Sequence, residues 1–266
     1  MLNIDRQLPM LSAAFSWVAR PWGHALACQP LAAVAPHGWT TRELALEGDD
    51  ARCEVAWTAL AMGEHVERDH VIRLRQVHGA TVVTAGEGRA AADALVSSDS
   101  RRLLAVKVAD CVPLLIADRR TGAVAAVHAG WRGTAARIAQ VVVRRMQEEC
   151  DSVPGELVAA IGPSIRACCY EVGPELREAF RAAGASDDEL SDWFTPGQGD
   201  RLQLDVPRSN ADQLVAAGVP PNQVHDSSLC TACHPAWFYS YRRDKESTGR
   251  LVGYIRAGTG QPRQDT

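Results

Sequence analysis

Residues 112–128 read Val-Pro-Leu-Leu-Ile-Ala-Asp-Arg-Arg-Thr-Gly-Ala-Val-Ala-Ala-Val-His, and the fold follows from this stretch. Two apolar runs, Val112 to Asp118 and Ala123 to His128, flank the turn-forming sequence Arg-Arg-Thr-Gly, which is typical of a β-hairpin. Counting outward from a loop at 119–122 places Pro113 directly opposite His128. We therefore predict an antiparallel hairpin with this register.

Segments on both sides of the hairpin have the periodicity of strands or helices. Alternating side chains predict a strand over 70–78, ending before Gly79, and apolar runs predict strands at 103–108 and 157–161. Helical spacing predicts helices over 134–149, with Thr134 as N-cap, over 174–183, and over 209–217 before Gly218. Strands mixed with helices, including an antiparallel hairpin, indicate an α+β fold with a mixed β-sheet.

Length and composition are those of a globular protein with one core. The chain has 266 residues, of which 46% are hydrophobic and 23% charged, and no linker interrupts the apolar pattern. The net charge of −4 gives no basic footprint, so we expect no nucleic-acid partner. No apolar run approaches the roughly 18 residues that a transmembrane helix needs, so we expect no membrane span.

The eight cysteines and the N-terminus together indicate the compartment. Residues 8–18 are moderately apolar, but Asp5 cancels Arg6, and Arg20 breaks the run, so we expect no secretory signal. We therefore predict a cytoplasmic protein with reduced thiols. The sequence Cys-Thr-Ala-Cys-His at 230–234 matches the haem-attachment pattern, but that attachment requires export. We expect these cysteines to be packing or loop thiols, or else a redox dithiol, and Cys168-Cys169 to pack near Tyr170.

The hairpin register brings a cysteine close to a histidine. Cys111 shares a face with Pro113, and so becomes a diagonal neighbour of His128, roughly 7–8 Å away. Such a pair can bind a metal or act as nucleophile and base. His78 also ends a predicted strand and favours the metal, because two imidazoles and a thiolate leave the open position of a catalytic zinc site. Three unrelated core side chains remain an alternative.

A glycine-containing segment follows His128. Residues 129–134 read Ala-Gly-Trp-Arg-Gly-Thr and precede the predicted helix. A helix N-terminus next to glycines offers free N–H groups to an anion, and Arg132 offers a forked guanidinium. We therefore predict a phosphate pocket formed by Gly130, Arg132 and Gly133. A glycine turn with a surface arginine is the alternative.

Three blocks carry a resemblance to a known family: Gln-Val-His-Gly at 76–79, Ala-Asp-Cys-Val-Pro at 109–113 and His-Ala-Gly-Trp-Arg-Gly at 128–133. They resemble the signature of the YfiH family, whose members are called laccase-domain proteins or purine nucleoside phosphorylases. Further matches follow in family order from Pro36 to Arg256. The resemblance implies a YfiH-like domain over 31–266, preceded by a variable extension over 1–30.

The resemblance also implies a fold and a chemistry. The fold would be a single three-layer α/β/α domain. Zinc, or copper, would bind His78, Cys111 and His128, the catalytic residues, with Gln76, Gly130, Arg132 and Gly133 at the substrate or phosphate. The implied reaction is phosphorolysis of adenosine, inosine or methylthioadenosine to base and ribose 1-phosphate, with adenosine deamination as a second activity, in a monomer or homodimer.

The residues of this chain favour some of the family's other activities less than others. A true laccase needs a copper cluster rich in imidazoles, whereas this chain has eight histidines and no His-x-His pair, so we do not expect polyphenol oxidation. Some members are described as peptidoglycan editing factors, which makes precursor hydrolysis an alternative. Thr40-Thr41-Arg42 runs directly into Glu43 without the family's glycine-rich loop. This altered region, Arg42 to Ala61, leaves open a metal-binding protein without turnover.

Overall fold

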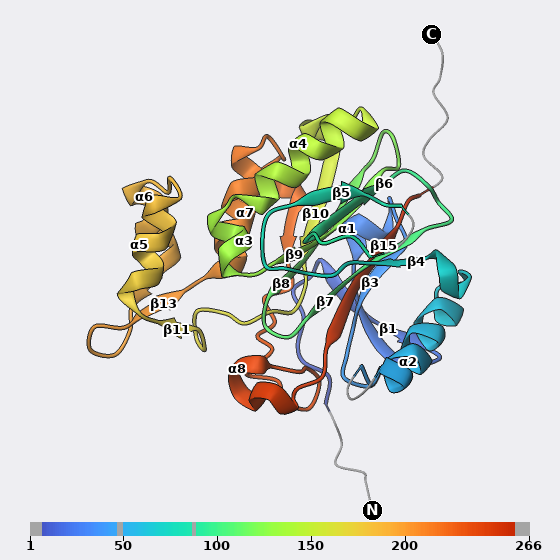
Figure 1. Ribbon diagram of the computed structural model, residues 1–266, viewed down its shortest axis with the longest axis horizontal. Coiled ribbons are helices and arrows are strands. Elements are labelled where there is room, and N and C mark those ends of the chain that lie inside the picture. Colours follow the sequence, from blue (N-terminus) through green and yellow to red (C-terminus); the bar gives the residue numbers. More distant parts are fainter. Residues whose placement is uncertain (1–6, 47–49, 87–88, 259–266) are drawn as a thin grey trace, which may run out of the picture.

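The computed structural model describes residues 7–46, 50–86 and 89–258, and its main feature is a pair of six-stranded sheets (Figure 1). The order of the first sheet is β1 (Phe15–Arg20), β2 (Gly23–Cys28), β3 (His37–Thr40), β15 (Leu251–Arg256), β7 (Leu103–Val108) and β4 (Val71–Arg73). That of the second is β14 (Val224–Asp226), β10 (Leu157–Ile161), β8 (Val112–Asp118), β9 (Val124–Ala129), β6 (Ala94–Ser97) and β5 (Val82–Thr84). Both sheets are mixed, because β4–β7, β5–β6 and β10–β14 pair in parallel and the other neighbours antiparallel.

Helices cover the outer faces of the two sheets (Figure 1). The first sheet is covered by α2 (Asp50–Gly63), and the second by α3 (Trp131–Ala135), α4 (Ile138–Cys150) and α7 (Val206–Ala216). Beside them lie α5 (Pro174–Ala182), α6 (Asp187–Trp193) and a small sheet of β11 (Glu171–Val172), β13 (Leu202–Leu204) and β12 (Phe194–Pro196). The remaining short helices are α1 (Gln29–Ala32), α8 (Tyr241–Asp244), η1 (Arg68–His70), η2 (Pro154–Glu156), η3 (Pro221–Gln223) and η4 (Lys245–Ser247).

The central strands are apolar on both faces because both faces are buried. In β8, Leu114 and Ile116 pack against the helices, whereas Leu115 and Ala117 pack between the two sheets. A strand buried on both sides loses the alternation of polar and apolar residues that marks a half-exposed strand. The space between the sheets therefore forms a second core, separate from the core under α4 and α7.

The predicted hairpin is confirmed in its register. Pro113 pairs with His128, and the loop closes with the amide of Asp118 donating to the carbonyl of Ala123 at 2.8 Å. Gly122 adopts φ 74°, a left-handed conformation that glycine tolerates. The strands predicted at 103–108 and 157–161 are also present, as are helices close to 174–183 and 209–217.

The α+β class and the mixed strand directions are confirmed, but there are two β layers rather than the single sheet of a three-layer α/β/α domain. The second layer arises from strands that pair over long sequence distances, such as β3 with β15. Residues 15–28, inside the segment 1–30 expected to be an extension, contribute β1 and β2 to this sheet. None of the helices in the described ranges has the length and apolar character needed to cross a bilayer.

Two predicted elements are wrong in their extent. The helix expected over 134–149 begins earlier, as α3, and is interrupted by Arg137 at φ 62° before α4. Thr134 is therefore inside α3 rather than an N-cap, and its buried hydroxyl accepts a hydrogen bond from Asn210 at 2.9 Å. The strand expected over 70–78 is reduced to β4, and the chain around His78 curls about a buried carboxylate instead of staying extended.

The altered segment from Arg42 to Ala61 lies away from the hairpin. Residues 47–49 of this segment are outside the described residues. From Asp50 onward the segment forms α2, whose Trp57 and Leu60 are buried against the first sheet. In the described part, this segment therefore contributes to the core of the first sheet.

The inter-sheet core should be sensitive to loss of volume. Leu115 is fully buried between the sheets, so Leu115→Ala should lower the free energy of unfolding by about 2–5 kcal/mol. Val215→Ala, at a side chain that is 39% exposed, should change it by less than about 1 kcal/mol. Chemical denaturation of both variants measures this difference, and equal effects would contradict the buried position of Leu115.

Candidate metal centre

Three side chains from separate parts of the chain converge at one end of the hairpin. His78 comes from the loop after β4, Cys111 immediately precedes β8, and His128 lies in β9. Their potential ligand atoms all lie within 4.8 Å of one another. The two imidazole rings have centroids 4.8 Å apart and are nearly perpendicular, at 84°. The structure thus brings together the three residues that the sequence singled out.

A buried carboxylate, that of Asp93, organises this convergence. It accepts hydrogen bonds from the backbone amides of Val77 (3.2 Å), His78 (2.9 Å) and Gly79 (2.7 Å), which curls the loop and holds His78 at φ 59°. Its Oδ1 also lies 2.9 Å from Nδ1 of His128. Because Nδ1 is engaged, Nε2 of His128 is the atom left to bind a metal. The sequence analysis did not predict this role for Asp93. The available signal was its position as a single acidic residue directly before the apolar strand β6.

The thiolate of Cys111 favours ligand binding, whereas a protonated His128 has to release its proton before it can bind a metal. Burial alone would raise the pKa of Cys111, but hydrogen bonds with His128 and His78 lower it to about 6. Burial would lower the pKa of His128, but its hydrogen bonds with Asp93 and Cys111 raise it to about 9. A thiolate with two imidazoles is a donor set that fits a metal ion of the zinc class and leaves a fourth position open. The same pairing of thiolate and imidazolium also fits a nucleophile and its base.

The glycines after His128 leave room for the triad. A Cβ on Gly130 would lie 3.2 Å from both Sγ of Cys111 and Cδ2 of His78, and a Cβ on Gly133 would lie 2.6 Å from the carbonyl oxygen of Gly79. The helix that begins here, α3, has only five residues, and Gly133 lies inside it. The glycines therefore permit close packing around the triad, and the helix that opens after Gly130 is shorter than the sequence predicted.

Asp110 positions the cysteine that follows it. Its φ of 85° is unusual for a residue other than glycine. Its Oδ1 accepts from the Thr231 hydroxyl and its Oδ2 from the Arg242 amide, both at 2.6 Å. Since both carboxylate oxygens are engaged, we interpret Asp110 as a structural hydrogen-bonder that fixes the approach of Cys111.

The triad lines a cavity of about 830 Å³ whose charged lining is strongly basic. Among the residues that the structure describes, Asp110 is the one acidic side chain in the lining. Aromatic rings of Trp131, Tyr170 and Tyr241 complete part of the wall. Such an excess of positive charge favours anions in the cavity. The cationic lining residues are Arg75, Arg89, Lys107, Arg132, Arg242, Lys245 and Arg250.

Gln76 and Arg132 are the two polar side chains predicted to contact substrate, and only Arg132 is free of other strong polar contacts in the described structure. Gln76 donates to the carbonyl of Lys107 (2.7 Å) and accepts from its amide (2.8 Å), so its amide group fastens the His78 loop to β7. Arg132 stacks on Trp131, with its guanidinium carbon 4.5 Å from the ring centroid. Among the described residues no carboxylate pairs with Arg132, which leaves its charge available to a ligand in the cavity.

The sequence matches, over residues 31–258, the family model described as multi-copper polyphenol oxidoreductase laccase. The chain belongs to this laccase-like YfiH family. Its structure is similar to that of Bacillus licheniformis YfiH, at a TM-score of 0.84 and 25% identity, covering 93% of this chain and 100% of that one. It is also similar to YlmD from Geobacillus stearothermophilus, at a TM-score of 0.82 and 29% identity, covering 92% and 98%.

Relatives with named activities are also similar along most of their length. A Deinococcus radiodurans protein named purine nucleoside phosphorylase is 39% identical over 86% of this chain and 90% of its own. A protein named adenosine deaminase RL5, from an unknown prokaryotic organism, is 37% identical over 76% of this chain and 81% of its own. These relatives indicate an enzyme acting on small molecules.

The role of Asp93 can be measured as metal affinity. Asp93→Asn removes the charge that fixes both His128 and the His78 loop, and it should weaken zinc binding at the triad roughly 10- to 100-fold. Titration against a competing chelator measures the change. Asp99→Asn is the matched control, because Asp99 pairs with Arg101 and Arg102 away from the cavity. Equal affinities in the two variants would argue against the organising role.

Proposed function

We propose that this protein is a metal-dependent purine nucleoside phosphorylase that converts adenosine, inosine or methylthioadenosine and phosphate to base and ribose 1-phosphate. The observation that carries the proposal is the excess of cations in the cavity beside His78, Cys111 and His128. The relatives named purine nucleoside phosphorylase support the same reading. We further propose that it acts in the cytoplasm, as a monomer or homodimer.

Phosphorolysis explains the charge of the cavity. An oxygen of inorganic phosphate bonds to C1′ of the ribose as the bond from C1′ to N9 breaks, and the electron pair leaves with the purine, which takes up a proton. Positive side chains hold the phosphate anion against the substrate. They also favour the negative charge that develops on the departing purine in the transition state. Deamination uses a neutral nucleoside and water, and so gives the arginines no anion to bind.

The residues divide into those that hold a metal and those that hold substrates. Zinc or copper bound by His78, Cys111 and His128 would supply a Lewis acid at the cavity wall. Arg132 is assigned to phosphate, and the rings of Trp131 and Tyr170 offer apolar surfaces on which a purine can pack.

The first test is whether base release requires phosphate. Purified zinc-loaded protein incubated with inosine and phosphate should yield hypoxanthine and ribose 1-phosphate, and Cys111→Ala should abolish both products. Chromatography of the products measures this. Cys53→Ala is a matched control, since Cys53 packs against the core of the first sheet, outside the cavity.

Each other product points to a different function. Inosine formed from adenosine without phosphate would favour the deaminase, the second candidate, which the similarity to adenosine deaminase RL5 supports. Release of an amino acid from a nucleotide-sugar precursor would favour a peptidoglycan-precursor editing hydrolase. Oxidation of a phenol would favour a copper polyphenol oxidase. No turnover at any metal loading would favour a metal-binding protein without activity.

Arg132 should act on phosphate rather than on nucleoside. Arg132→Ala should raise the KM for phosphate roughly tenfold, about the effect of one lost charge-assisted hydrogen bond, and leave the KM for inosine nearly unchanged. Steady-state kinetics with each substrate varied in turn measures the two constants. Arg101→Ala, at a side chain outside the cavity lining, is the control. A larger change in the KM for inosine than in the KM for phosphate would contradict the assignment of Arg132 to phosphate.

A further inference from the structure

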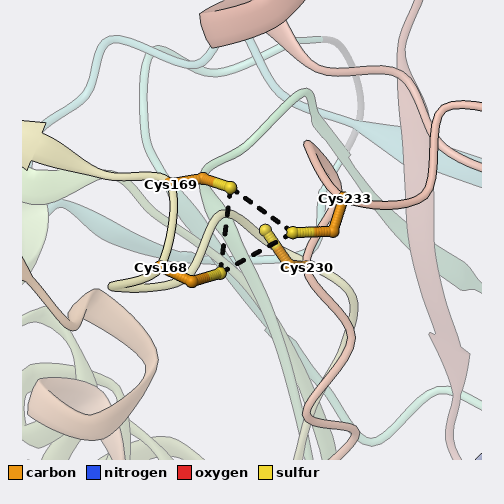
Figure 2. Close-up of side chains that lie close together, drawn as sticks. All are labelled: Cys168, Cys169, Cys230 and Cys233. Atoms are coloured by element: carbon orange, nitrogen blue, oxygen red, sulfur yellow. Dashed lines mark hydrogen bonds between the residues drawn. The ribbon is translucent and has the colours of Figure 1, made fainter.

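Four cysteines that take no part in the triad meet at a second place in the fold (Figure 2). Cys168 and Cys169 lie in the loop between β10 and β11, and Cys230 and Cys233 lie in the loop after β14. All four sulfurs are within 4.8 Å of one another, and Figure 2 shows them pointing toward a common centre. The two pairs lie about sixty residues apart in the sequence, and no local pattern connects them.

Three of the distances between the sulfurs are close to those of a tetrahedron around one ion. Zinc–sulfur bonds of about 2.3 Å in a tetrahedral site place neighbouring sulfurs about 3.8 Å apart. Here Cys168 and Cys169 are 3.8 Å apart, Cys168 and Cys233 3.7 Å, and Cys169 and Cys233 3.4 Å. We propose that Cys168, Cys169, Cys230 and Cys233 bind one structural zinc ion.

Other uses of four thiols fit this geometry less well. A disulfide joins each sulfur to one partner at about 2.0 Å, whereas Cys233 lies at nearly equal distances from two sulfurs. An iron–sulfur cluster separates its ligand sulfurs further, because several irons and sulfides lie between them. A closed set of four thiolates is the donor set of a structural zinc site, and it differs from the triad, which has three ligands.

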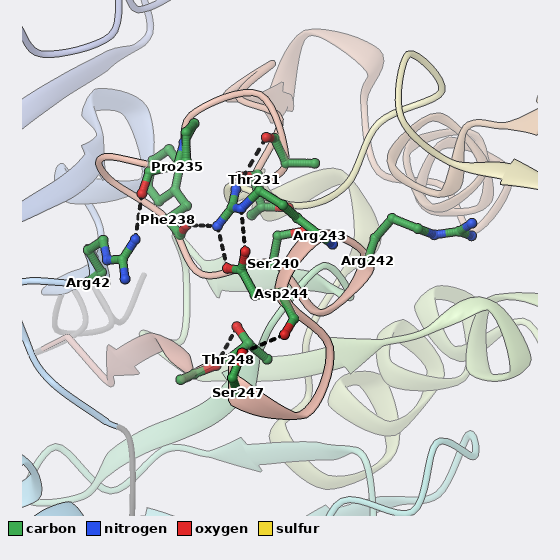
Figure 3. A network of polar contacts seen from close by, with 12 residues as sticks. Arg42, Thr231, Pro235, Phe238, Ser240, Arg242, Arg243, Asp244, Ser247 and Thr248 are labelled. Atoms are coloured by element: carbon green, nitrogen blue, oxygen red, sulfur yellow. Dashed lines mark hydrogen bonds and ion pairs between the residues drawn. The ribbon is translucent and has the colours of Figure 1, made fainter.

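Backbone contacts hold the two loops in this arrangement. The amide of Cys169 donates to the carbonyl of Arg166 at 2.9 Å, and Cys230 forms a parallel bridge with Ser164. Arg243 donates to the carbonyls of Thr231 (3.0 Å) and Ala232 (3.2 Å), inside the turn between Cys230 and Cys233 (Figure 3). The same guanidinium pairs with Asp244 at 2.6 Å, which fixes its position against the turn.

The ion would join a loop that lines the cavity to a loop that contacts the residue before Cys111. Tyr170 follows Cys169 and lines the cavity, with the Arg242 guanidinium 4.9 Å above its ring. Thr231 follows Cys230 and donates to Asp110, which positions Cys111. A zinc site at this point would therefore stabilise the geometry of the triad from outside the cavity. The inference stands whether or not the enzyme is a phosphorylase.

Metal content separates the two sites. Cys111→Ser removes the thiolate of the triad, and the protein purified without oxygen should still contain one zinc per chain. Adding Cys168→Ser and Cys233→Ser should remove that zinc, whereas adding Cys53→Ser should not. Elemental analysis and a thiol count on the same samples measure this. A zinc-free Cys111→Ser protein, iron in place of zinc, or oxidised cysteine pairs would each overturn the proposal.

Cobalt provides a readout that does not depend on activity. Cobalt-loaded Cys111→Ser protein should show a thiolate-to-cobalt charge-transfer band and tetrahedral visible bands, and both should be lost in Cys111→Ser with Cys168→Ser and Cys233→Ser. Circular dichroism shows whether that variant folds. If it does not, the protein with Cys111→Ser and Cys233→His is used instead, because histidine can still supply a fourth ligand to the ion. Visible bands that shift with the change of ligand support the site, and an unchanged spectrum overturns it.

Discussion

The pairing of β8 with β9 is the constraint on which both the core and the candidate site depend. With Pro113 opposite His128, alternate residues of the hairpin enter the helix-side core and the inter-sheet core. A slip of one residue would exchange the two faces, placing His128 under the helices and away from Cys111. The same register that fills two cores with aliphatic side chains therefore also directs an imidazole to the cavity.

Asp93 adds the electrostatic part of this constraint. Its side chain is fully buried, and burying a carboxylate is costly unless it is hydrogen-bonded and paired. Three backbone amides and the His128 ring satisfy it, and these contacts lower its pKa despite its burial. The loop carrying His78 is thus held against β9 by one charge, and the position of two candidate ligands is linked through a single side chain.

The wall of the cavity combines regular elements with loops: β7 supplies Lys107 and β9 supplies His128, whereas Tyr170 comes from a loop. The segments around Tyr170 and Thr231 both contact Asp110, whose backbone carbonyl accepts from the Ile165 amide and whose carboxylate accepts from the Thr231 hydroxyl. Loops are more mobile than the elements they connect, so contacts that hold them in place help to set the shape of the cavity. The second cluster of cysteines lies where these two segments meet, which connects the chemistry of the cavity with the stability of its wall.

The sequence by itself determined the hairpin, its register, the strands at 103–108 and 157–161, and the family, because these depend on local periodicity or on motifs a few residues long. It also brought His78, Cys111 and His128 into consideration together. Only the tertiary structure decided the second β layer, the break at Arg137, the role of Asp93 and the basic lining of the cavity. The physical reason is range: strand pairing between β3 and β15, or contact between Cys169 and Cys233, joins residues whose spacing in the chain carries no periodic signal.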